Sequence, residues 1–548
     1  MGSLSKRYGY ASYRLLVGYL SIFLVVIGFI CLLPLIMIAF YQTEWGCYPA
    51  FLVPGGASLV LGLILGPLLL RKREASRLGK HQDAVLLVAI WLAAITIGAL
   101  PFYLADKLSV GPVAQQMVSM TFSEAFFESM SGFSATGYSV TRNYLAAYGT
   151  PLADPYYGQT CAHVFLFYRA LTQFFGGVGL VLIVTSAISD RYGLKLFFAE
   201  GHNDRLLPNL AKTAKVTFSI YCGIILLGSF VLWLFGVDFF EAICQSTAGM
   251  ATGGFATRST GFYYYYTDVY PGNGIFPYNP IGAEITMCVI MLLGATSFLL
   301  IYNLIRGKLK NFFKDCEVRF AAFFLFFAIA LGTITVYFQY DGPGGPIDWF
   351  TALRYSGFQI ISCLTTTGFG NAPSITNLGQ AIITLSIIAM IIGGGSGSTA
   401  GASKQIRVVV VLKELWWSIK YKLSPRRQLI PHNIYRAGKT IEVTPEYYRD
   451  NALYLVTYLI VLFALILGMV MVPNIDFEQS FYLSASALSG TGNTIVDFLQ
   501  YGASNPLWAY NYLLWINSLA MFLGRLEIMP MYYAIIRVGK DVVGKETI

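Results

Sequence analysis

Four short stretches of the sequence place hydroxyl side chains and glycine between long apolar runs. They read "SGFSATGYSV" (131–140), "GMATGGFATR" (249–258), "SCLTTTGFGN" (362–371) and "SALSGTGNTI" (486–495). When the glycine that follows a hydroxyl residue is aligned, the matching positions are Gly137, Gly253, Gly368 and Gly490, at intervals of 116, 115 and 122 residues. Spacing this regular predicts a fourfold internal repeat.

The residue types in these stretches suit the coordination of a dehydrated monovalent cation. Backbone carbonyls can replace the hydration shell of such an ion, and glycine adopts the φ and ψ angles that aim successive carbonyls at one axis. A divalent site would use carboxylates, which these positions lack. Close helix packing by small residues is the alternative, but it would have to recur four times at one period. We predict a filter formed by Ala135, Thr136, Gly137, Tyr138, Ala251, Thr252, Gly253, Gly254, Thr366, Thr367, Gly368, Phe369, Leu488, Ser489, Gly490 and Thr491.

A glycine-rich segment, "IIGGGSGSTAGASKQIR" (391–407), interrupts a later apolar run. Each glycine costs a helix about 1 kcal/mol relative to alanine, so we expect this segment to be unwound. Irregular backbone is tolerated at membrane depth where it is buried in protein or lines a water-filled path. The segment lacks the GxxxxGK[ST] pattern of a phosphate loop, and glycines that only pack helices are the alternative. We predict a gate formed by Gly393, Gly394, Gly395, Ser396, Gly397, Ser398, Thr399, Ala400 and Gly401.

Arg525 lies inside the last apolar run. A lone cation in a membrane segment is costly and is usually functional or paired. Below a cation filter its positive charge would repel the ion, so we include Arg525 in the gate. A structural pair with Glu527, or extension of the side chain to the cytoplasmic interface, is the alternative. Arg169, in contrast, is expected to bond buried carbonyls or acids near the outer end.

The composition places these stretches in an integral membrane protein, since 56% of the residues are hydrophobic and only 12% are charged. A helix needs roughly 20 apolar residues to cross the bilayer. Ten runs qualify: 14–40, 51–70, 84–104, 164–188, 216–237, 282–304, 320–338, 378–394, 453–472 and 508–535. Shorter apolar stretches precede the glycine loops and predict re-entrant helices. The β-barrel pattern of alternating polarity is not found.

The positive charges predict the orientation of the chain, because cytoplasmic loops retain lysine and arginine. Alternate loops hold 31 of the 37 lysines and arginines, namely 1–14, 71–81, 190–216, 306–319, 404–449 and 537–548. Both termini are therefore expected in the cytoplasm. This bias explains the net charge of +9, so nucleic acid is not expected as a partner. We expect a multi-pass protein of a bacterial inner membrane, with a eukaryotic plasma membrane as the alternative.

The expected fold is an all-α polytopic membrane protein in which four span–pore helix–span repeats surround one ion pore in pseudo-fourfold arrangement, after an N-terminal two-helix hairpin. The expected divisions are the hairpin (1–83), pore repeat 1 (84–190), pore repeat 2 (191–306), pore repeat 3 with the gating loop (307–417) and pore repeat 4 (418–548).

The motifs resemble those of the Trk/Ktr/HKT superfamily of potassium transporters, most closely its TrkH-type subunits. The resemblance covers about residues 84–535 and rests on "ATGYS", "ATGGFATR", "TTTGFG", "RALTQFFGGVGLVL" (169–182) and "GGGSGSTAGASKQIR". It implies K⁺ as the transported ion, a homodimer and a cytosolic nucleotide-binding regulator of the TrkA type. It also implies that the glycine-rich loop obstructs the pore and that Arg525 matches the family's pore-facing arginine.

Two positions refine what the resemblance implies. Members that prefer Na⁺ often replace the first filter glycine with serine, whereas this chain has Gly137, which favours K⁺. The fourth loop reads "SGTGNT" where members often have Gly-Pro-Gly, so either Gly490 or Gly492 is the filter glycine.

We therefore predict a potassium uptake channel subunit with no catalytic residues and no organic cofactor. The basic segments 190–216 and 404–449 are the surfaces expected to meet the regulator. The alternatives are a secondary symporter of K⁺ or Na⁺ and the K⁺-translocating subunit of a P-type ATPase. The symporter is less favoured because the repeats are parallel and acids near the membrane midplane are scarce. A membrane enzyme is the weakest alternative, because no nucleophile, base or metal constellation emerges.

Overall fold

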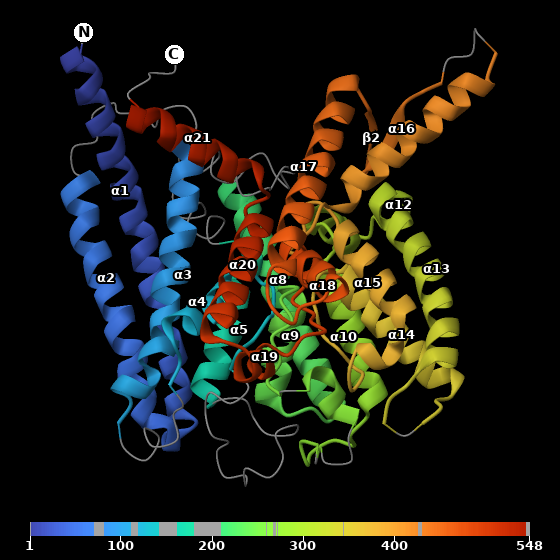
Figure 1. The fold of residues 1–548 in the computed structure, drawn as a ribbon, viewed down its shortest axis with the longest axis horizontal. Helices are drawn as coiled ribbons and strands as arrows, with labels where there is room; N and C mark the ends of the chain where they lie inside the picture. The colour runs from blue at the N-terminus through green and yellow to red at the C-terminus, as the bar shows by residue number, and fades with distance from the viewer. Residues whose placement is uncertain are drawn as a thin grey trace.

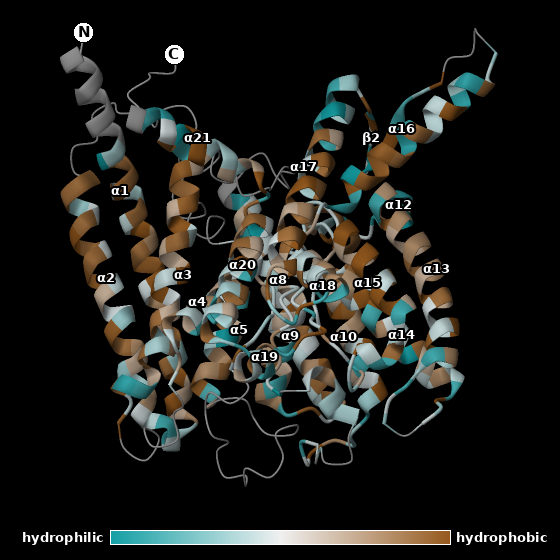
Figure 2. Cartoon of the chain, in the orientation of Figure 1, coloured by the Kyte–Doolittle hydropathy of each residue, from teal (hydrophilic) through white to brown (hydrophobic). Residues whose placement is uncertain are grey.

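The computed structural model describes residues 2–70, 82–110, 119–141, 162–179, 210–258, 260–266, 270, 272–343, 345–425 and 430–543. Most of its helices run side by side, and the start of the first helix lies on the same face of the molecule as the end of the last (Figure 1). Apolar residues cover the outer helices, whereas hydrophilic residues gather toward the helix ends (Figure 2). This distribution is that of a protein whose sides face lipid.

The chain begins with a helical hairpin made of α1 (Gly2–Leu32) and α2 (Tyr48–Leu70), joined by the short helices η1 (Leu33–Ala39) and η2 (Gln42–Cys47). Small residues let the two long helices approach closely. A Cβ atom at Gly28 would stand 2.7 Å from the carbonyl oxygen of Gly55 on the facing helix. Residues 71–81, which the expected division also places in the hairpin, lie outside the described residues.

Four sets of helices follow, each with a long helix, a short helix and a third helix, which in the second to fourth sets is followed by a further helix. The first is α3 (Gln82–Leu108), α4 (Phe122–Phe133) and α5 (His163–Val178). The second is α8 (Leu210–Leu234), α9 (Phe239–Met250), α10 (Pro280–Gly294) and α11 (Phe298–Ile305). The third is α13 (Cys316–Gln339), α14 (Trp349–Leu364), α15 (Gln380–Ile392) and α16 (Gln405–Leu423). The fourth is α17 (Pro445–Val470), α18 (Phe477–Ser489), α20 (Leu507–Arg525) and α21 (Met529–Val543).

Smaller elements connect these sets. They are η4 (Gly261–Tyr266), α12 (Leu309–Lys314), η5 (Thr376–Leu378), α19 (Phe498–Ser504) and the strands β1 (Asn433–Arg436) and β2 (Lys439–Glu442). The two strands form an antiparallel hairpin in which Asn433 pairs with Glu442. Helix α16 leans away from the other helices, and α21 lies across the end of α3 (Figure 1).

The short helices α4, α9, α14 and α18 begin at side chains that suit a helix N-terminus. Thr121 and Asp476 complete capping boxes, and Asp238 and Asp348 accept backbone N–H groups of the first turn. Such caps satisfy N–H groups that a helix leaves without an internal partner. With 12 to 16 residues each, these helices are too short to cross a bilayer, as expected for re-entrant segments.

Among the described residues, six helices are long and apolar enough to span a membrane, and two further pairs pass the same test but are bent. The bend is 112° between α10 and α11 and 102° between α20 and α21. The runs expected to cross the membrane at 282–304 and 508–535 are thus each formed by two helices, with breaks after Gly294 and Arg525. The second span of the first set was expected to end at residue 188, which lies outside the described residues.

Candidate functional site

The four glycine loops leave their short helices by one common backbone pattern. In each loop the N–H of one residue reaches the carbonyl five positions back, over 2.8 to 2.9 Å. The residue before that N–H is left-handed, with φ of 52 to 54° at Ala135, Thr252 and Thr366 and 71° at Gly490. The N–H donors are Thr136, Gly253, Thr367 and Thr491. The loops therefore correspond position by position.

The next residue in every loop is a glycine with positive φ, and these glycines connect the four loops in a ring. A Cβ atom on any of them would stand well under 3.0 Å from a carbonyl oxygen of the following loop. The contacts run from Gly137 to Gly253, from Gly254 to Thr367, from Gly368 to Thr491 and from Gly492 back to Thr136. Only glycine fits these positions, both for space and for conformation.

This geometry corrects the register that the sequence indicated. Gly254 corresponds to Gly137 and Gly368, one residue beyond Gly253, and of the two alternatives in loop 4 Gly492, not Gly490, takes this place in the ring. The rule of a glycine after a hydroxyl failed because loop 2 has two consecutive glycines. It failed in loop 4 because Gly490 fills the left-handed position that Ala135 fills in loop 1.

Other expected filter residues also shift in register. Ala251 corresponds to Ser134, and Leu488 corresponds to Phe133, the last residue of α4. Both therefore precede the part of the loop that forms the ring. Tyr138 and Phe369 follow the ring glycines of their loops, as expected.

Hydroxyl groups stabilise three of the loops from within. Thr136 and Ser134 are 2.6 Å apart through their hydroxyls, and the corresponding distances in loops 3 and 4 are 2.9 and 2.6 Å. Loop 2 has Gly253 in place of this threonine, and the amide of Gln173 fills the space. Its nitrogen donates to the Gly253 carbonyl and its oxygen accepts the Phe255 N–H.

Buried ion pairs hold the outer side of the loops. Arg169 pairs with Glu128 at 2.9 Å, and Arg258 pairs with Glu241 at 2.6 Å. Arg354 pairs with Glu284 at 3.0 Å. Arg169 also donates to the Ala256 carbonyl, so its predicted bonds to a buried acid and a carbonyl are confirmed. Because each arginine is paired with a glutamate, these residues hold the loops in place and do not present unpaired charges to the ring.

The glycine-rich segment lies directly beneath the ring. The chain is irregular from Gly393 to Lys404, which confirms the predicted interruption. Thr399 donates to the carbonyls of Met250 and Gly294, and the Gly401 N–H donates to the Thr366 hydroxyl at 2.8 Å. The segment is thus held against the inner ends of loops 2 and 3.

The same segment is also bonded to α16 and α13. Gln405 donates to the Gly393 carbonyl at 3.0 Å, and Glu317 accepts the Ser396 N–H at 2.8 Å. The second oxygen of Glu317 is 3.7 Å from Arg436 of the β-hairpin. Sequence reasoning missed Glu317 and Gln173. The only signal for Glu317 was an acid at the start of an apolar run.

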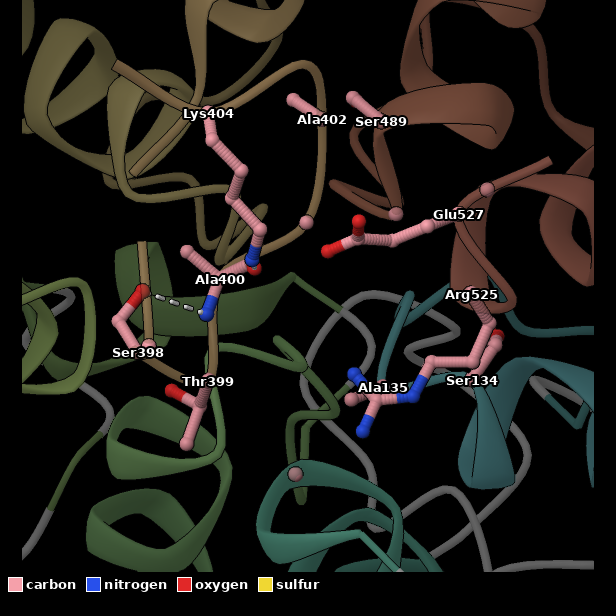
Figure 3. Close-up of a pocket in the computed structure, with 15 residues that line it drawn as sticks. Ser134, Ala135, Ser398, Thr399, Ala400, Ala402, Lys404, Ser489, Arg525 and Glu527 are labelled. Atoms are coloured by element: carbon pink, nitrogen blue, oxygen red, sulfur yellow. Dashed lines mark hydrogen bonds between the residues drawn. The ribbon is translucent and has the colours of Figure 1, made fainter. Parts of the chain in front are cut away.

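A small cavity of about 40 Å³ lies between loops 1 and 4 and the glycine-rich segment. Figure 3 shows that Arg525, Glu527 and Lys404 extend toward it from two sides. Arg525 donates to the Gly176 carbonyl and lies 5.3 Å from the ring centre of Trp91. Glu527 pairs with Arg407 at 2.7 Å, and Lys404 donates to the Ala400 carbonyl. Arg525 thus borders this cavity together with Ser134, Ala135 and Ser489 of the loops.

Comparisons with known proteins agree with this architecture. The family described as TrkH, cation transport protein, matches residues 157–540. An uncharacterized cation transporter of Methanocaldococcus jannaschii is 27% identical over 92% of both chains. The Trk system potassium uptake protein TrkH of Halomonas elongata is 25% identical over 95% of this chain and 98% of that protein. The crystal structure of the potassium transporter TrkH from Vibrio parahaemolyticus superposes with a TM-score of 0.73 at 22% identity, covering 95% and 98% of the two chains.

Proposed function

The chain belongs to the TrkH family of cation transport proteins, and from this membership we propose that it is the K⁺-conducting membrane subunit of a Trk-type uptake system. As a member of a transport family it is a multi-pass transporter and not an enzyme. The relatives named as Trk system potassium uptake proteins support K⁺ as the ion.

The observation that carries the proposal is the closed ring of four glycine loops. In the proposed filter, K⁺ loses water and binds carbonyl oxygens of the ring, with Thr136, Gly253, Thr367 and Thr491 as the first candidates. The paired carboxylates outside the ring leave neutral oxygens as the ligands, which suits a monovalent ion that must also leave.

In the proposed gate, the glycine-rich segment closes the path below the filter and Arg525 adds an electrostatic barrier. Its guanidinium borders the cavity between filter and segment, where a like charge raises the energy of a passing cation. Inward movement gains about 2.3 kcal/mol per charge for every 100 mV of membrane potential, so uptake needs no catalytic step.

The distribution of positive charge supports a cytoplasmic position for both termini and a bacterial inner membrane as the location. We propose that a cytosolic nucleotide-binding regulator docks on this face, at 404–449 and at 190–216, of which 190–209 lies outside the described residues. We also propose a homodimer. Helix α16 supports it, because Leu415 and Trp416 expose 58% and 64% of their surface there.

Flux measurements on the purified chain in liposomes test the function. With K⁺ and Na⁺ gradients, we expect K⁺ flux whose reversal potential follows the K⁺ gradient alone. Gly368→Ser should reduce the preference for K⁺, whereas Gly223→Ala, at a helix position with open space, should leave it unchanged. A reversal potential that shifts with H⁺ or Na⁺ would indicate a symporter, and flux that requires a copurifying ATPase would indicate a pump subunit. Either result would contradict the channel.

A further inference from the structure

An apolar cavity of about 230 Å³ lies beside the glycine-rich segment, between the second and third helix sets. Its walls are apolar side chains of α10 to α14, including Leu292, Leu300, Phe312, Leu325 and Leu364. This cavity is separate from the space beneath the filter loops, with which it shares no lining residue. Its surface suits a hydrocarbon group and not a hydrated ion.

The cavity borders the elements that we assign to the gate. Gly395 and Gln405, at the two ends of the glycine-rich segment, line it together with Glu317. Thr365 lines it as well and bonds through its hydroxyl to Thr367 of the third filter loop. An occupant of the cavity would therefore touch both the gate segment and the base of one filter loop.

The side of the cavity formed by α13 faces the membrane. Ala322 lines the cavity and is exposed, and the neighbouring Phe323 and Phe326 are 64% and 69% exposed. Large apolar side chains exposed on a long apolar helix are in contact with lipid chains in a bilayer. A lipid chain can thus reach the cavity without crossing a polar surface.

A cluster of basic residues lies where α11, α12 and α13 meet, at the same end of the cavity as Phe312. Arg306, Lys308, Lys310, Lys314 and Arg319 are all exposed. The two acids of this region are buried and bonded, Asp315 to the Ala437 N–H and Glu317 as described above. No described acidic side chain forms an ion pair with the three lysines. Each such charge near a membrane surface attracts anionic lipid by about 1 kcal/mol.

We propose that an anionic phospholipid of the cytoplasmic leaflet binds here, with one acyl chain in the cavity and its phosphate on the lysines of α12. The inference rests on the proposed gate. To open, the segment must move away from the pore axis, and the cavity is the space behind Gly395 and Gln405. Close packing of an acyl chain in that space opposes the movement, so the bound lipid favours the closed state.

The binding test uses the full chain, purified in detergent and incubated with phosphatidylglycerol, with bound lipid counted by native mass spectrometry. Ala321→Trp fills the cavity, and the variant Lys308→Gln, Lys310→Gln, Lys314→Gln removes the charge. We expect each to retain about tenfold less phosphatidylglycerol than the unchanged chain. Phe326→Trp, on the exposed side of the same helix, is the matched control and should retain the full amount. Equal retention in all four proteins would overturn the proposal.

The functional test compares K⁺ flux in phosphatidylcholine vesicles with flux in vesicles that also contain phosphatidylglycerol. We expect several-fold slower flux with the anionic lipid, and no such difference in the triple lysine variant. Inorganic phosphate added to phosphatidylcholine vesicles should have no effect, and slowing by phosphate alone would contradict a lipid ligand. Lipid retention without any K⁺ flux would count against the channel function and leave the lipid site intact. Flux that ignores lipid composition would contradict the coupling to the gate.

Discussion

At the scale of single residues, the ring of glycine loops depends on four glycines whose positions the sequence indicated only in part. Gly137 and Gly368 were identified by their neighbours, because each follows a threonine and is the first glycine after its helix. In loops 2 and 4 a neighbouring glycine satisfies the same pattern, so the alignment took Gly253 in place of Gly254 and left Gly490 and Gly492 as alternatives. Only the backbone angles and the contacts between loops show which of the two glycines in each of these loops belongs to the ring.

The two glycines of the fourth loop should respond differently to substitution. Gly492→Ala places a methyl group against the Thr136 carbonyl and should sharply reduce K⁺ flux and the preference for K⁺, as Gly368→Ser should at the equivalent position. Gly490→Ala should retain most of it, because the nearest atom to its Cβ is 3.8 Å away and alanine already occupies the matching position in loop 1. Liposome flux of both variants checks this. An equal loss of K⁺ flux in both variants would contradict the assignment of Gly492 as the ring glycine of the fourth loop.

Gln173 and Gly253 should show coupled effects. A threonine at position 253 would match the other loops, but its Cβ would stand 2.5 Å from the Gln173 side chain. Gly253→Thr should therefore lower thermal stability and K⁺ flux, and adding Gln173→Ala should recover part of both. Thermal unfolding in detergent and liposome flux of the double-mutant cycle measure the coupling. Additive losses of stability and flux would show that the Gln173 side chain does not occupy the space that a threonine side chain occupies in the other loops.

At the scale of elements, the long helices were predictable because a bilayer demands about 20 apolar residues for each crossing. The breaks in α10–α11 and α20–α21 were not, because an apolar run lies on both sides of each bend and the few polar residues between them do not distinguish a break from a continuous span. Both breaks lie close to where the helix meets the C-terminal end of the short helix of its set. Gly294 and Gly524 lie so close to the carbonyls of Met250 and Leu488 that no side chain fits. Such contacts between distant segments leave no local signal.

The β-hairpin and the gate segment are linked through Glu317, which gives a prediction at this scale. Glu317→Ala removes the acceptor of the Ser396 N–H and the partner of Arg436, so K⁺ flux without a regulator should rise several-fold. Arg436→Gln should raise it less, since the bond to Ser396 remains. Glu414→Gln, on α16 beside His432, is the control. Unchanged flux in Glu317→Ala would mean that the link does not restrain the gate.

At the scale of the whole molecule, the sequence indicated one membrane protein with four similar parts, and the comparisons confirmed the family. The oligomeric state could not be predicted from one chain, because it depends on contacts between copies. Helix α16 leans away from the bundle and exposes apolar side chains, as is typical of a surface that contacts another protein or the membrane.

We expect the double variant Trp416→Ser, Leu415→Ser to convert a dimer to monomers, as measured by light scattering in detergent. Leu331→Ser, lipid-exposed on α13, is the control, and an unchanged dimer would exclude this surface.

The central claim is that the four loops together bind the transported ion on one axis. Crystals grown with Tl⁺ in place of K⁺ test it most directly, because Tl⁺ scatters anomalously and substitutes for K⁺ in oxygen sites. We predict anomalous density enclosed by the carbonyls of Thr136, Gly253, Thr367 and Thr491, within the ring that Gly137, Gly254, Gly368 and Gly492 close. Density at another place in the bundle, from protein that conducts K⁺, would contradict the account.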